Sequence, residues 1–374
     1  MTIYLDYNAT TPVLPEVADL VYKMMIDEFG NAGSRTHEFG VAAKKAVELA
    51  RTQVANVVSV DKTEVIFTSG ATESNNIAIL GLREYAERSG KNHIITTQIE
   101  HKAVLEPIKH LELQGFDVTY LGSNEDGQIN VDELKEALRD ETFLVSIMHI
   151  NNETGSIQPI IDVCRTLAVH EAYLHVDAAQ SFGKYPKDLD NPRIDLISVS
   201  GHKLYAPKGI GALILRRRGF TKLPLKPIFF GGGQEKGLRP GTLDVPSIAG
   251  FGLACDLAVK NSQKWCKHAV NLKDNLMESL KVLGANFNGS NTSPYVLNFS
   301  VPNVSSEAAM VMLKGIVSVS NGSACTSNNY TPSHVLSAMG LSPERIAGAI
   351  RVSWSHQTTT IPSNEICQTI KKLL

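Results

Sequence analysis

Cysteine is scarce in this sequence of 374 residues, which contains five cysteines and no CxxC pair. A low and odd number of cysteines argues against a disulfide framework and favours a reducing compartment. The first basic residue is Lys23, and Asp6 lies where a secretory signal would be apolar, so no such signal is expected. No apolar stretch approaches the ~20 residues of a membrane span. We therefore expect a cytoplasmic protein without a membrane partner.

An excess of charge of either sign is also missing. Lysine and arginine together number 36, against 38 aspartate and glutamate residues, and the formal net charge is −2. Proteins that hold nucleic acid by neutralising its phosphates usually carry a basic excess, so no direct nucleic-acid partner is expected. Hydrophobic residues make up 43% and charged residues 20% of the chain. This composition is typical of a globular protein and excludes general disorder.

Short apolar runs alternate with amphipathic stretches through the first two thirds of the sequence. The runs predict strands at residues 64–68, 93–97, 117–121, 143–147, 173–176, 196–199 and 211–215. The stretches between them predict helices at residues 74–89, 103–114, 131–139 and 161–170. Nearly continuous apolar strands separated by helices indicate an α/β fold with a mostly parallel sheet. A long helical pattern over residues 246–284 leads into a smaller α+β domain, with strands near residues 295–299 and 351–354.

Polar residues follow five of the predicted strands. Ligands of such sheets bind beyond the carboxyl ends of the strands, so these residues are candidates for one site. They are Thr72, His101, Asn152, Asp177 with Gln180, and Ser200 with Lys203. Each of them is weak evidence by itself. Their occurrence at one edge of one sheet is difficult to assign to chance.

Lys203 and Asp177 have the most specific chemistry of this set. A lysine in a glycine turn at a strand end can form a Schiff base with an aldehyde, although a lone lysine on a loop is more often a surface residue. A carboxylate after a buried strand needs a cation or donors. The protonated pyridine nitrogen of pyridoxal phosphate (PLP) is such a cation, and an ordinary turn cap is the alternative.

Two loops have the composition of anion sites. Residues 69–74 (SGATES) open a helix, and free N–H groups there can hold a phosphate, although an ordinary helix N-cap is equally expected. The glycine-rich residues 231–242 (GGGQEKGLRPGT) allow a backbone to approach a phosphate closely. His101, at the same edge as the first loop, can lie flat on a cofactor ring or move protons.

Cys325 differs from the other cysteines because small polar residues surround it (SVSNGSACTS, 318–327). We expect an accessible loop, in which a thiol can act as a nucleophile. Arg351 lies mid-strand between apolar neighbours and needs a partner, either a substrate carboxylate bound in bidentate fashion or a structural salt bridge. Burial in helical apolar patterns is expected for the remaining cysteines, which are Cys164, Cys255, Cys266 and Cys367.

Ten segments between Leu5 and Trp354 together resemble the NifS/IscS-type cysteine desulfurases of the class V aminotransferase family. They are LDYNATTP (5–12), FGNAGSRTHEFG (29–40), TSGATESNN (68–76), EHKAV (100–104), NNETG (151–155), HVDAAQ (175–180), SGHKLYAPKGIG (200–211), GGGQEKGLRPGT (231–242), SNGSACTS (320–327) and IRVSW (350–354). They follow the family's order over almost the whole chain, and HVDAAQ, SGHK and GSAC are highly specific.

The resemblance implies a homodimer with fold type I of the PLP-dependent transferases. It implies a large PLP-binding domain over residues 15–260, and a small domain of residues 1–14 and 261–374 that carries the cysteine loop. Lys203 would hold PLP as a Schiff base and later move the Cα proton. Asp177 would pair with the pyridinium nitrogen, and His101 would stack on the ring.

The remaining site residues are implied by the same resemblance. Gln180 would form a hydrogen bond with the phenolic oxygen of PLP. Arg351, helped by Asn152, would bind the carboxylate of the substrate L-cysteine, and Asn152 would also contact the cofactor. No metal site is expected. The implied phosphate ligands are Ala71, Thr72, Ser200 and His202, joined by Thr242 from the other subunit.

The implied reaction transfers sulfur to the protein itself. The Cys325 thiolate would attack the sulfur of L-cysteine and become a persulfide, L-alanine would leave, and an acceptor protein would take the sulfur. Two features differ from the housekeeping IscS pattern: the sequence ends 23 residues after Arg351, and Ala32-Gly33 stand where a proline is commoner. Both resemble members with dedicated sulfur routes, including DNA phosphorothioate modification, while iron–sulfur cluster supply is the other route.

Other functions stay open at this point. Another class V PLP enzyme, such as a selenocysteine lyase or a small-molecule aminotransferase, would share most of these motifs, and an aminotransferase would not need Cys325. A non-catalytic α/β protein that binds a phosphorylated ligand would lack the yellow colour of bound PLP.

Overall fold

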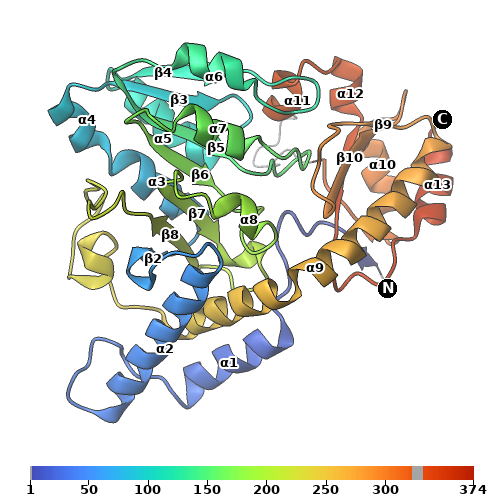
Figure 1. Cartoon of the computed structure of the whole chain (residues 1–374). Coiled ribbons are helices and arrows are strands. Elements are labelled where there is room, and N and C mark those ends of the chain that lie inside the picture. Colours follow the sequence, from blue (N-terminus) through green and yellow to red (C-terminus); the bar gives the residue numbers. More distant parts are fainter. Residues whose placement is uncertain (1, 322–331) are drawn as a thin grey trace.

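The computed structural model describes residues 2–321 and 332–374, so Cys325 lies outside the described residues. The described chain forms a large α/β body and a smaller body (Figure 1). The long helix α9 (Val245–Lys281) runs from the first body into the second.

A seven-stranded sheet forms the centre of the large body, in the order β2-β8-β7-β6-β5-β3-β4. The strands from β3 to β7 run parallel to one another, and β8 is antiparallel to both β7 and β2. All seven predicted strands are present, and the mostly parallel sheet is confirmed. Their bounds are β2 (Val65–Thr68), β3 (His93–Thr97), β4 (Asp117–Leu121), β5 (Thr142–Met148), β6 (Tyr173–Asp177), β7 (Leu196–Ser200) and β8 (Gly211–Leu215).

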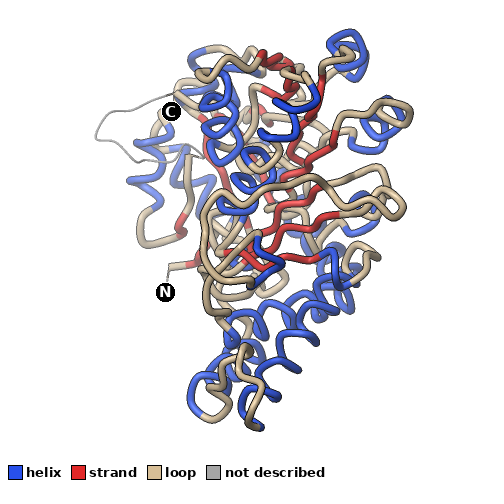
Figure 2. Tube along the Cα trace, turned by 90° about the vertical axis from the view of Figure 1, so that its left-hand side faces the viewer, coloured by secondary structure: helices blue, strands red, loops and turns tan. Residues whose placement is uncertain are grey.

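Helices cover both faces of this sheet, as the continuous apolar strands predict (Figure 2). Neighbouring strand residues such as Ile94 and Ile95, or Leu213 and Ile214, belong to two different apolar clusters, because successive side chains point to opposite faces. One cluster packs under α3 (Ala71–Leu80), α4 (Arg83–Ser89) and α5 (Lys102–Glu112). The other packs against α9 and against α1 (Pro15–Ile26), α2 (Glu38–Asn56), α6 (Val131–Ala137) and α7 (Ile160–Thr166).

The single helix expected over residues 74–89 is wrong in two respects. Helix α3 begins earlier, at Ala71, and a break at Gly81 separates it from α4. The carbonyl of Gly81 accepts a hydrogen bond from Lys226 N, and a Cβ at Gly81 would lie 3.0 Å from Leu225 Cδ2. The close approach of a distant segment therefore interrupts a pattern that is locally helical.

The smaller body has its own apolar core, which joins both parts of the chain that flank the large body. Leu5 packs there together with residues from Ala269 to Ile370. Strand β10 (Val296–Ser300) pairs antiparallel with β9 (Asn286–Phe287) and β12 (Ala349–Ser353), and β1 (Ile3–Tyr4) pairs parallel with β11 (Val317–Ser318). The limits of the two domains stay a prediction. The remaining helices are α8 (Pro186–Leu189), α10 (Ser306–Leu313), α11 (His334–Ala338), α12 (Pro343–Ala347) and α13 (Ser363–Lys371), with 3₁₀ turns η1 (Lys62–Glu64), η2 (Gly201–Lys203) and η3 (Gln234–Gly237).

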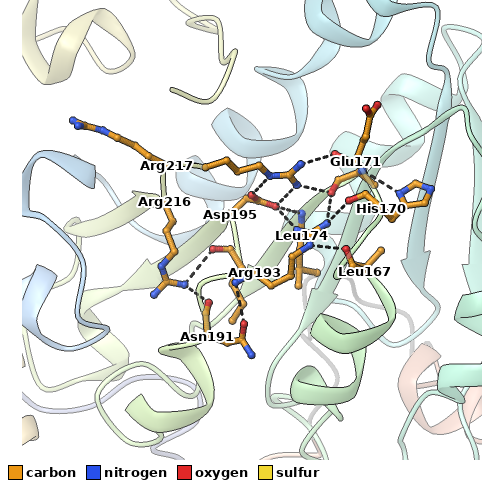
Figure 3. Close-up of polar contacts among 12 residues, drawn as sticks. Leu167, His170, Glu171, Leu174, Asn191, Arg193, Asp195, Arg216 and Arg217 are labelled. Carbon is orange, nitrogen blue, oxygen red and sulfur yellow. Dashed lines mark hydrogen bonds and ion pairs between the residues drawn. The ribbon is translucent and has the colours of Figure 1, made fainter. Parts of the chain in front are cut away.

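A cluster of arginines fixes the amino ends of the central strands (Figure 3). Asp195, directly before β7, is 2% exposed and accepts hydrogen bonds from Arg193 at 2.8 Å and Arg218 at 2.7 Å. Arg216 donates to the carbonyls of four residues outside the sheet, among them Val58 and Asn191. Buried charges need such partners, and these polar contacts hold the sheet at the edge opposite to the strands' carboxyl ends.

Two of the four cysteines expected to be buried are buried, namely Cys164 and Cys255. Cys266 and Cys367 are only half-buried, because both lie on the margin of a helix face, where Cys367 Sγ reaches the carbonyl of Ser279. In the described part of the chain, no helix is both long and apolar enough to span a membrane.

Candidate active site

The carboxyl ends of the strands open into a cavity of about 660 Å³. Strand β2 runs in the same direction as β7, because both are antiparallel to β8, and so the ends of β2, β3, β5, β6 and β7 meet at one edge. The structure brings together ten of the predicted site residues in the lining: Ala71, Thr72, His101, Asn152, Asp177, Gln180, Ser200, His202, Lys203 and Arg351.

Lys203 lies in η2, directly after β7, and its amine points to the segment that follows β1. Its Nζ donates hydrogen bonds to the carbonyl oxygens of Asn8 at 2.5 Å and Ala9 at 2.8 Å. Burial, assisted by the positive charge of Arg351, lowers the pKa of Lys203 to about 7. A large fraction of the amine is therefore neutral near pH 7, and the neutral form is the one that attacks an aldehyde.

Asp177 ends β6, and its carboxylate is held in a fixed orientation. It accepts hydrogen bonds from Asn75 Nδ2 at 2.8 Å and from the backbone N–H of Ala179 at 2.9 Å. Gln180, one turn further on, donates from Nε2 to the carbonyl of Asn8 at 3.0 Å. Its Oε1 is buried without a hydrogen-bond partner among the described residues. Buried polar atoms are rarely left unpaired, so this atom indicates that a polar ligand belongs in the cavity.

His101 caps the N-terminus of α5, where its Nδ1 accepts a hydrogen bond from Ala103 N at 3.1 Å. Burial lowers the pKa of His101, and the positive charge of Lys203 adds to this effect. The imidazole is thus neutral near pH 7. A neutral ring on the cavity wall suits stacking against an aromatic cofactor.

The loop between β2 and α3 forms an anion cradle. Gly70 has a φ of +148° and leads into the first turn of α3, whose N–H groups are free for an anion. A Cβ at Gly211 would lie 2.6 Å from Gly70 Cα, so glycine is needed there for the strands to approach. His202, bonded through Nδ1 to Thr10 Oγ1 at 3.1 Å, has its pKa lowered to about 4 by burial, and it contributes hydrogen bonds to this side of the cavity rather than charge.

Arg351 on β12 forms the structural salt bridge that was one of the two roles open to it, and its binding of a substrate carboxylate stays a prediction. Its Nη2 forms an ion pair with Asp6 at 2.6 Å, and its Nη1 donates to the carbonyl of Asn152 at 3.0 Å. Its Nε is buried and, in residues 2–321 and 332–374, has no acceptor. The guanidinium is therefore positioned by a structural salt bridge, and Arg351 lines the cavity with one donor that these residues leave unpaired.

Among the described site residues, Thr242 is not brought into this cavity. Thr242 is exposed and does not line it, and its expected role concerns the other subunit. Cys325 falls outside the described residues. Ser320, two residues before the undescribed stretch, does line the cavity.

Sequence reasoning missed residues that line or support this site. Asp6 and Asn8 lie in the LDYNATTP segment, and Asn8 accepts hydrogen bonds from Lys203 and Gln180. Asn75 orients Asp177, and Glu73 lines the anion cradle. The signal that could have found the first two is a run of polar residues without helix or strand periodicity, which is typical of a segment held by a site.

The cofactor PLP fits these residues. The amine of Lys203 suits its aldehyde, the N-terminus of α3 suits its phosphate, and the carboxylate of Asp177 suits its pyridinium nitrogen. The unpaired Oε1 of Gln180 marks the same cavity as the place of a polar ligand. Fold and site together define a PLP-dependent enzyme of fold type I.

Comparison with known proteins narrows this class. The aminotransferase class-V model matches residues 3–361. The cysteine desulfurase IscS of Buchnera aphidicola is 45% identical over 362 residues, covering 96% of this chain and 89% of its own. A solved NifS-like protein is 38% identical with a TM-score of 0.90, over 100% of this chain and 98% of its own. DndA from Streptomyces lividans is 49% identical with a TM-score of 0.82, over 94% and 99%. The chain therefore belongs to the class V aminotransferase family, as one of its NifS/IscS-type cysteine desulfurases, which use PLP.

Proposed function

We propose that this enzyme converts L-cysteine to L-alanine and keeps the sulfur as a persulfide on Cys325. The observation that carries the proposal is that the Lys203 amine and the Arg351 guanidinium line the same cavity. A second contact supports it: Ser320 and Arg351 exchange two backbone hydrogen bonds, of 3.2 and 2.6 Å. The chain that leads to Cys325 is therefore tied at Ser320 to the strand that carries Arg351, the residue to which we assign the substrate carboxylate.

In the proposed reaction, side chains of this protein bind the substrate, move its proton and accept its sulfur. Bound PLP supplies an electron sink for charge that develops at the substrate Cα. Arg351 binds the carboxylate of L-cysteine, and Lys203 moves the proton at Cα. The Cys325 thiolate attacks the substrate sulfur, so that an S–S bond forms as the C–S bond breaks. The substrate Cβ takes the electron pair and a proton and becomes the methyl group of L-alanine. Sulfur is oxidised and Cβ is reduced, and no further redox partner is needed.

Replacing the thiol tests this proposal. In Cys325→Ser we expect the absorbance of bound PLP to be unchanged and sulfide release from L-cysteine to fall by about 100-fold or more, because the nucleophile is lost. Cys266→Ser, which replaces a half-buried cysteine of α9, is the matched control and should keep full activity. Undiminished turnover of Cys325→Ser would instead favour an aminotransferase or a selenocysteine lyase.

We also propose a homodimer in which Thr242 reaches the phosphate bound by a second copy. Apolar side chains gather at the exposed end of α1 and α2: Met25 is 61%, Phe29 67% and Phe39 46% exposed, and the two phenylalanine rings stack at 5.6 Å. Exposed apolar patches of this kind mark interaction surfaces. Thr242 is exposed outside its own cavity, which leaves it available to another chain.

The route that the sulfur takes after the persulfide is also proposed from similarity. The Ala32-Gly33 pair and the 49% identity to DndA support a dedicated route such as DNA phosphorothioate modification. Iron–sulfur cluster assembly is the alternative, supported by the 45% identity to IscS. In either route a cytoplasmic acceptor protein would take the persulfide sulfur.

A further inference from the structure

Glu73 is an acidic residue at the mouth of the anion cradle, where a phosphate group would be repelled by it. It lies in the first turn of α3 and lines the cavity. Its Oε2 accepts a hydrogen bond from the backbone N–H of Ser69 at 2.5 Å. The carboxylate therefore fixes the turn that precedes the cradle, but it also places a negative charge beside the site of a second anion.

Arg239 provides the compensating charge. Its Nε forms an ion pair with Glu73 Oε1 at 3.0 Å, with the side chains 27% and 13% exposed. His202 and Lys208 also line the cavity. His202 is neutral because burial lowers its pKa to about 4, and Lys208 is exposed at the rim.

The loop that carries Arg239 is held rigidly in spite of its glycines. Glu235 on this loop is buried and forms a bidentate ion pair with Arg51 of α2, at 2.8 and 2.6 Å. Glu235 also accepts a hydrogen bond from Phe67 N on the edge strand β2, at 2.7 Å. Gln234 accepts one from Gly241 N at 3.0 Å and so closes the loop on itself. These contacts therefore fix the position of Arg239 beside Glu73.

We propose that Glu73 and Arg239 are positioning residues for the cofactor phosphate. Glu73 holds the turn at Ser69 in the shape that presents the N–H groups of α3. Arg239 holds Glu73 in place and cancels its charge, so that a phosphate dianion can enter. The inference rests on the assignment of PLP to this cavity, and not on the conversion of cysteine.

Titration of the full-length chain with PLP and with pyridoxal, which lacks the phosphate, tests the inference. The dissociation constants are measured by quenching of tryptophan fluorescence, without cysteine. Arg239→Gln should weaken PLP binding by about five- to tenfold, as expected for an uncompensated charge near a partly exposed site, and should leave pyridoxal binding unchanged. Equal losses for both ligands, or no loss, would overturn it. Because no cysteine is present, the outcome is independent of the Cys325 experiment.

Two further variants separate charge from shape. Glu73→Gln combined with Arg239→Gln should restore most of the PLP affinity, because the unpaired carboxylate is gone; a double variant as weak as Arg239→Gln would contradict the charge argument. Arg239→Lys keeps the positive charge and should bind PLP more tightly than Arg239→Gln, and it serves if the glutamine variant does not fold. Arg83→Gln breaks an exposed ion pair with Glu87 on α4 and is the control, with wild-type affinity.

Discussion

Lys203 differs from an ordinary surface lysine in its burial and its charged neighbours. Both are results of the fold: the lysine follows β7, whereas Arg351, the cation that helps to lower its pKa, comes from β12. The sequence predicted Lys203 and Asp177 because each lies at the end of a strongly apolar strand. It did not predict Asp6 or Asn8, because their roles depend on partners that only tertiary packing brings near.

The rate at which apoprotein binds PLP covalently should depend on pH through Lys203. The protonated amine does not react, so the rate should fall about tenfold per pH unit below the pKa of about 7 and level off above it. Stopped-flow absorbance near ~420 nm, where the imine of PLP absorbs, measures this rate. Lys203→Ala is the control and should show no such band at any pH. A rate that still rises steeply at pH 9 would contradict the lowered pKa.

Helix α9 is the element that shows how closely the parts of the large body pack. A Cβ on Gly250 would lie 2.5 Å from Val21 Cγ2 of α1, and one on Gly252 would lie 2.5 Å from Ala50 Cα of α2. Long helices of this kind are predictable from their pattern, and α9 was. The break at Gly81 was not, because residues 225–226 impose it from a distant part of the chain.

Gly252→Ala should lower the free energy of unfolding. Alanine gains about 1 kcal/mol in helix propensity, but overpacking costs about 1–3 kcal/mol, and the contact is with a backbone atom that cannot rotate away. We expect a net loss of about 1 kcal/mol, seen as a lower midpoint in urea unfolding. Gln263→Ala, exposed on the same helix, should change stability little. A Gly252→Ala protein as stable as wild type would show that α2 and α9 can separate freely.

The whole molecule presents an apolar surface at the end of α1 and α2 that residues 2–321 and 332–374 do not cover. Phe29 and Phe39 are exposed there, in and beside the loop that joins α1 to α2. That loop lies at the far end of the helix pair from the smaller body (Figure 1). The sequence predicted the homodimer through resemblance alone. No periodicity reveals which surface would be used, because these phenylalanines lie in and beside a loop.

Phe39→Glu should convert a dimer into a monomer, because burying an unpaired carboxylate in the interface is costly. Light scattering of the purified protein should give twice the chain mass for wild type and the single mass for the variant. PLP should also bind more weakly to the monomer if Thr242 acts across the interface. Val169→Glu, at a residue 98% exposed and away from this patch, should remain dimeric. A wild-type protein that is monomeric would remove the basis for the role of Thr242.

The small body is built from both flanks of the chain, and this sets the order of events during synthesis. Residues 65–215, which contain the whole central sheet, leave the ribosome before β11 and β12 are translated. The partners of β1 and Asp6 lie in β11 and β12, so neither can pair until the end of the chain is made. Until then the cavity lacks the wall around Arg351. A growing polypeptide can therefore complete its central sheet early, but the cavity gains its last wall only when Arg351 has been translated and has paired with Asp6.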